Sequence, residues 1–154
     1  MSKLDLQKPG DLGRFFAVHH TCFRALAAHH AYSGLAQMIG ALERDLHHLG
    51  APVLPDARLQ PVDPLAVAYI IEGSRMGSKV LRSRWKRSTD PTVQGASAYF
   101  SLKPDGQRWR DLCAALSVFD TRSSRAALIV SDTVVIFELF THICETSAQA
   151  QLLR

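Results

Sequence analysis

Apolar side chains recur at intervals of three and four residues along most of the chain, and this spacing restricts the fold more than any other feature. Residues spaced in this way lie on one face of a helix. The pattern predicts helices at residues 11–30, 33–49, 64–85 and 107–119, and a last helix from about residue 121 onward. The apolar side of that last helix comprises Ala127, Val130, Val134, Phe137, Phe140 and Cys144. We therefore expect an all-α protein.

Turn residues separate the predicted helices. Asp63 followed by Pro64 is typical of a helix start, because the carboxylate can cap the first turn and proline fits the first helical position. Gly50 and Pro52 mark the end of the preceding helix. Residues 126–140 are rich in Val, Ile and Phe, so a strand is an alternative there. The apolar run continues without a turn signal, which favours a helix.

Length and composition indicate one soluble domain. A chain of 154 residues with 47% hydrophobic residues can form a single core, which we place over residues 1–154. Three cysteines without a CxxC pair exclude a disulfide scaffold, and Cys22, Cys113 and Cys144 each lie among apolar residues. The N-terminus lacks the apolar core of a signal peptide, and no run approaches the roughly 20 apolar residues of a membrane helix. We expect a cytoplasmic protein that does not enter a membrane.

Two glycines, Gly73 and Gly77, lie four residues apart inside the helix predicted at residues 64–85. Each costs about 1 kcal/mol of helix stability relative to alanine, so a compensating role is expected. The pair leaves a strip of bare backbone that a flat ligand could approach. Close packing against another helix is the alternative.

Six basic residues accompany the glycine pair with no acid between them: Arg75, Lys79, Arg82, Arg84, Lys86 and Arg87. Such a cluster could bind carboxylates or phosphates. A solvated helix end is the alternative for each residue. Binding to nucleic acid is disfavoured, because few aromatic residues interleave with the cluster and the net charge is only +4.

Other kinds of site lack their sequence patterns. The chain contains neither a GxxxxGK[ST] nor a GxGxxG turn for a nucleotide phosphate, and Ser74 does not lie in a GxSxG motif.

Seven histidines include the pairs His19–His20, His29–His30 and His47–His48. Neighbours on a helix point about 100° apart, so a pair cannot chelate one metal ion. His19 lies on the apolar stripe of its helix, where a hydrogen-bonded core histidine is the alternative to a ligand.

The segment from Val67 to Leu81, VAYIIEGSRMGSKVL, resembles the distal helix of bacterial biliverdin-producing heme oxygenases, with their EGSxxG pattern. The segments DLGRFFAV from Asp11, LERDLHHLG from Leu42 and RWR from Arg108 are similar to other family segments in the same order. In the family a further N-terminal helix carries the axial histidine, and the similarity begins with the second helix. The resemblance implies a single-domain heme oxygenase-like helix bundle, shortened at its N-terminus.

The resemblance also implies a function and the residues that perform it. Heme would lie against Gly73 and Gly77, the catalytic positions, and the product would be biliverdin, iron and carbon monoxide. The implied cofactor-binding residues are Gly73, Ser74, Gly77, Arg75, Lys79, Arg82, Arg84 and Phe137, the basic ones as partners of the heme propionates. His19 and His20 are the candidate metal ligands on this chain.

Two functions remain open from the sequence. The first is heme binding with oxidative cleavage, which requires an electron donor. The second is a shortened relative without that chemistry, which binds a tetrapyrrole or another protein. In either case an open groove would expose an apolar strip, which favours a homodimer or a partner chain that covers the strip.

Overall fold

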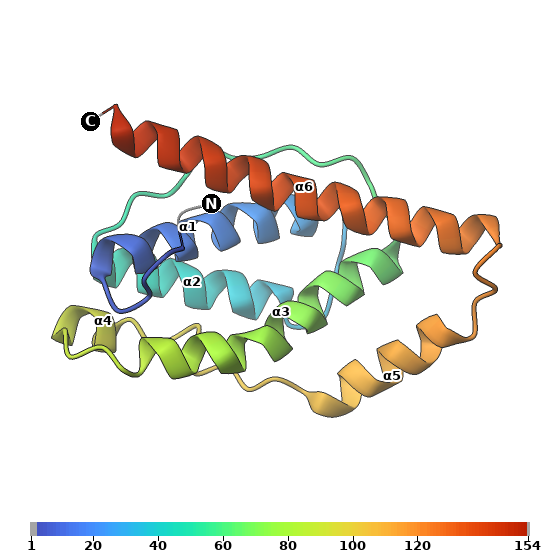
Figure 1. Ribbon diagram of the computed structural model, residues 1–154, viewed down its shortest axis with the longest axis horizontal. Coiled ribbons are helices and arrows are strands. Elements are labelled where there is room, and N and C mark those ends of the chain that lie inside the picture. Colours follow the sequence, from blue (N-terminus) through green and yellow to red (C-terminus); the bar gives the residue numbers. More distant parts are fainter. Residues whose placement is uncertain (1–2, 154) are drawn as a thin grey trace.

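A computed structural model describes residues 3–153, and in this range the protein is entirely helical (Figure 1). The all-α prediction is confirmed. The helices are α1 (Pro9–Ala27), α2 (Leu35–Leu49), α3 (Pro64–Trp85), α4 (Pro91–Gly95), α5 (Gly106–Ser117) and α6 (Ser124–Leu152).

The core forms around α1, which packs against α2 and carries Phe16 and Phe23 without solvent exposure. The long helix α6 extends along one side of the molecule (Figure 1). Its C-terminal half contacts α1, where Arg14 donates to the carbonyl oxygen of Cys144 at 2.9 Å. Its N-terminal half contacts α3. Helix α6 thus connects two helices that are distant in sequence.

Asp63 fixes the start of α3, as its sequence position predicted. Its carboxylate accepts from the backbone N–H of Leu65 at 2.9 Å and pairs with Arg125 of α6, with 2.5 Å between Nε and Oδ2. The backbone N–H of Asp63 donates to Asp132 of α6 at 2.6 Å. One buried carboxylate therefore caps α3 and attaches it to α6.

No helix was predicted between residues 85 and 107, so the short helix α4 was missed from the sequence. Asp90 caps it by accepting from the N–H of Thr92 at 2.8 Å, and Pro91 occupies its first position. Five residues are too few for a helical periodicity to emerge, so only the Asp-Pro pair could have predicted this helix.

The prediction of the apolar side of α6 was wrong. The buried residues of α6 are Ile129, Ile136, Ile143 and Ser147, whereas Val130, Val134 and Phe137 are 64%, 47% and 54% exposed. The helix is apolar on more than one face, so periodicity could not decide which face contacts α1 and α3. Among the described residues, α6 alone is long and apolar enough to cross a membrane, with mean hydropathy 1.7 over a window that is only 17% buried.

The three cysteines differ in environment, which the sequence did not predict. Cys22 is fully buried, and burial raises the pKa of its thiol to about 12. Cys144 is half-buried, and Cys113 is exposed on α5 rather than set in the core. Each is a free thiol.

Candidate functional site

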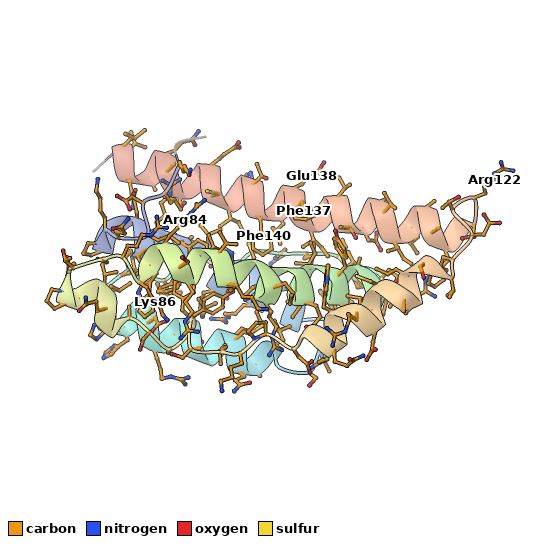
Figure 2. All side chains as sticks on the ribbon, turned by 60° about the horizontal axis from the view of Figure 1, so that its bottom comes forward. Arg84, Lys86, Arg122, Phe137, Glu138 and Phe140 are labelled. Carbon is orange, nitrogen blue, oxygen red and sulfur yellow. The ribbon has the colours of Figure 1, made fainter. Side chains whose placement is uncertain are left out.

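A cavity of about 510 Å³ opens between α1, α3, α5 and α6. Nine residues line it: His19, Tyr69, Ile70, Gly73, Ser74, Met76, Trp109, Phe137 and Phe140. Figure 2 shows Phe137 and Phe140 on the part of α6 that faces α3. Apart from the imidazole of His19 and the hydroxyl groups of Ser74 and Tyr69, the lining is apolar or aromatic. The cavity therefore suits a ligand with a large apolar surface.

Gly73 supplies bare backbone to one wall. A Cβ atom at this position would meet Trp109 at 3.7 Å, an ordinary van der Waals distance, so the indole of α5 lies directly beside the glycine. Trp109 also packs against the ring of Tyr69, with 5.7 Å between ring centroids and the planes tilted by 36°. The indole covers part of the glycine strip and leaves the cavity beside it open.

Gly77 does not line the cavity. The residue is exposed, and a Cβ atom there would have nothing within 4 Å. Of the two glycines predicted to form a slot, the structure places only Gly73 in the wall. Ser74 and Phe137, two further residues of the predicted binding site, also line the cavity.

His19 lines the cavity from α1. Its Nδ1 bonds to the carbonyl oxygen of Phe15 at 2.8 Å, so Nδ1 carries the proton and donates. The imidazole packs against Phe15 at 4.0 Å and edge-on to Phe140 at 5.4 Å between centroids. Burial lowers the pKa of His19 to about 4, since the backbone hydrogen bond offsets only part of the desolvation. At neutral pH the imidazole is uncharged, and its Nε2 has a free lone pair.

His20 points away from the cavity. Its ring is 1% exposed, and Nε2 lies 3.1 Å from Oε1 of Glu43 on α2. The structure thus separates the two histidines that the sequence offered as metal ligands, and only His19 reaches the cavity. No group of three His, Cys, Asp or Glu residues within 3–153 could hold a metal ion by itself.

The predicted basic residues do not gather at the cavity. Arg75 faces the other side of α3, where Nη2 donates to the carbonyl oxygen of Lys103 at 3.0 Å. Lys79 and Arg82 are exposed, and Arg82 lies about 180° around the helix from Gly73, given 3.6 residues per turn.

Arg84 differs from these three, because it lies on nearly the same face as Gly73 and Gly77. Figure 2 shows it on the C-terminal half of α3, toward α6.

Trp109, Tyr69, Ile70, Met76 and Phe140 belong to the cavity but were absent from the predicted site. Phe140 was assigned to the apolar side of α6, and Trp109 was noted only as part of the family pattern. Tyr69, Ile70 and Met76 share the face of Gly73 by helical spacing, which is the signal that could have identified them. Nothing in the sequence shows that α5 packs against this face.

The neighbouring position of the same α3 turn carries a buried carboxylate. Glu72 is 1% exposed, accepts from the hydroxyl of Tyr32 at 2.8 Å and lies 3.5 Å from Nε of Arg108. Arg108 also lies over the ring of Tyr32. Because Arg108 precedes Trp109 on α5, these contacts position the indole against Gly73.

Comparisons with known protein families, with curated proteins and with solved structures gave no match.

The pKa of His19 predicts a pH-dependent stability. Between pH 6.5 and about 4 the unfolded chain binds a proton at this residue and the folded chain does not, so stability falls as the pH decreases through this window. Urea unfolding at pH 7 and pH 4.5 should show the wild type losing about 2 kcal/mol more than His19→Gln. Equal losses in the two proteins would contradict the neutral, buried imidazole.

Proposed function

We propose that the protein binds heme or a closely related tetrapyrrole in the cavity between α1, α3, α5 and α6. Its volume of about 510 Å³ lies within the range of roughly 300–1,000 Å³ that is typical of small-molecule sites. A flat aromatic macrocycle can pack against Trp109 and Phe137 and approach the backbone at Gly73. These features support the function that the sequence resemblance implies.

The observation that carries the proposal is that Gly73 and His19 line the same cavity from different helices. Helix α3 offers backbone without a side chain, and α1 offers an imidazole nitrogen. A neutral histidine whose Nδ1 donates to a carbonyl group is oriented in the way that protein metal ligands commonly are. Imidazole is also a common axial ligand of heme iron. We assign this role to His19 rather than to His20.

The carboxylates of a tetrapyrrole would lie at the mouth of the cavity, because none of the lining residues is a lysine or arginine. Arg84 is the predicted propionate partner that the geometry favours. It follows Gly73, the glycine of the cavity wall, by eleven residues on nearly the same face of α3, about 17 Å along the helix axis.

Heme supplies the oxidation chemistry when bound, while the chain supplies binding and orientation. Oxidative cleavage to biliverdin, iron and carbon monoxide is the reaction that we propose from the resemblance. The alternative is a tetrapyrrole-binding module without turnover. Adding an electron donor to the heme complex separates the two, since cleavage replaces the heme spectrum with that of biliverdin and a module leaves it unchanged.

Gly73→Leu tests the wall of the cavity. The added side chain would fill the space beside Trp109, so hemin binding should weaken at least tenfold in an absorbance titration. Gly77→Ala is the matched control on the same helix, and it should leave the affinity within twofold. It should also stabilise the fold by about 0.5–1 kcal/mol, since a Cβ atom there is unobstructed. Equal affinities of wild type and Gly73→Leu would reject this site.

His19→Ala tests the iron ligand. The substitution should shift and broaden the Soret band of the hemin complex, and added imidazole should restore the band. His20→Gln, a change in the neighbouring residue, should leave the spectrum unchanged. Metal-free protoporphyrin should bind wild type and His19→Ala about equally, because it has no iron to ligate. An unchanged Soret band in His19→Ala would contradict the assignment.

A further inference from the structure

Helix α5 has fewer buried residues than any other helix that lines the cavity. Only Leu112 of its twelve residues is buried, whereas twelve of the nineteen residues of α1 are buried. It packs mainly against α3, and non-helical segments at residues 101–105 and 118–123 connect it to the chain. Few buried apolar contacts are typical of segments that open without unfolding of the whole protein.

The same helix borders two cavities beside α3. Trp109 lines the cavity of about 510 Å³, and Leu116 lines a second cavity of about 370 Å³ between α3, α5 and α6. Tyr69 of α3 lines both. Movement of α5 away from α3 would therefore open both cavities and withdraw the indole of Trp109 from Gly73.

One ion pair attaches α5 to its neighbours. Nε of Arg108 lies 3.5 Å from Oε1 of Glu72, and its guanidinium lies 5.4 Å from the centre of the Tyr32 ring. Within residues 3–153, the other side-chain hydrogen bonds of α5 stay inside the helix or involve its cap, Asp105. Arg108 is thus the polar attachment of α5, and it lies one residue before the indole.

This attachment leaves the carboxylate of Glu72 incompletely paired. The residue is 1% exposed, and its Oε2 is buried with no hydrogen-bond donor among the described residues. The distance of 3.5 Å from Arg108 to Oε1 is also too long for a strong hydrogen bond. A buried carboxylate oxygen without a donor is unfavourable relative to one in water. Opening of α5 would break the ion pair but admit water to Oε2, which offsets part of the loss.

We propose that α5 is a lid over the cavity and that the ion pair between Glu72 and Arg108 is the latch that holds it closed. The lid moves on its two connecting segments. Arg75 of α3 keeps the first segment in place, because it donates to the carbonyl oxygen of Lys103 at 3.0 Å. Opening gives a flat ligand the space beside Gly73 that the indole occupies in the closed lid. The role in ligand entry rests on the proposed function, whereas the opening itself does not.

Hydrogen–deuterium exchange of the ligand-free full chain tests the opening, with Arg108→Met and Arg110→Met as a matched pair. Both remove a guanidinium from α5, but Arg110 is exposed and bonds only to Gln107 of its own helix. In the wild type, the amides of residues 110–117 should exchange at least tenfold faster than those of residues 13–26, after correction for intrinsic rates. Arg108→Met should accelerate exchange at 110–117 at least fivefold further, and Arg110→Met should leave it within twofold. Neither variant should change residues 13–26 more than twofold.

Glu72→Gln tests the latch from its other side. The amide oxygen can still accept from the hydroxyl of Tyr32, but the charge that attracts Arg108 is lost. Exchange at residues 110–117 should therefore accelerate as it does in Arg108→Met. Equal exchange of the two segments in the wild type, or equal acceleration of both in Arg108→Met, would overturn the lid. No acceleration at 110–117 in either Arg108→Met or Glu72→Gln would overturn the latch.

Stopped-flow absorbance with hemin tests the role in entry. Association should be at least fivefold faster in Arg108→Met than in the wild type, because a larger fraction of the chains is open. Arg110→Met should associate at the wild-type rate. A fixed wall that the variant merely weakens would change dissociation and leave association unchanged, and this result would overturn the gating of entry. A wild type that binds no hemin would contradict the proposed function, while the exchange experiment would still decide whether α5 opens.

Discussion

The contact between Gly73 and Trp109 sets the shape of the proposed site. The indole of α5 lies so close to α3 that even a methyl group at position 73 would touch it, at 3.7 Å. The buried Glu72, bonded to Tyr32 and close to Arg108, holds α5 from the neighbouring position of the same turn. A bulky side chain at position 73 would force α5 outward or fill the cavity. The missing side chain at this glycine lowers helix stability, and it leaves open space beside the backbone.

Helix α6 completes the cavity and also has an open face. Its buried side holds α1 through Arg14 and α3 through Asp63, and Phe137 and Phe140 extend from it toward the cavity. Val130, Val134 and Phe137 of the same helix are 64%, 47% and 54% exposed, so α6 also carries apolar surface that the chain leaves open.

The sequence predicted the helices well, because Asp63-Pro64 and the glycines at helix ends mark local boundaries. It also predicted that Gly73, Ser74 and Phe137 would share a site, and these residues do line one cavity. It failed where tertiary packing decides. The periodicity of α6 could not show which apolar face contacts the core, and the basic cluster could not show that Arg75 bonds to Lys103 on the far side of α3.

The two histidines illustrate the same limit. They are adjacent in sequence and about 100° apart on α1, so one faces the cavity and the other faces Glu43. The positions of α2 and α6 decide which of the two histidines faces the cavity and which faces Glu43. The heme assignment itself depends on the sequence resemblance together with a cavity of suitable size and lining.

The most direct test of the central claim is an NMR titration of the ¹⁵N-labelled protein with gallium protoporphyrin, a diamagnetic analogue of heme. The ring current of a bound macrocycle should shift the backbone amides of Gly73 and Ser74 and the indole N–H of Trp109 the most. The amides around Ala51, which line a separate cavity near the start of α1, should remain unshifted. Shifts centred on that second cavity, or none at all, would contradict the account.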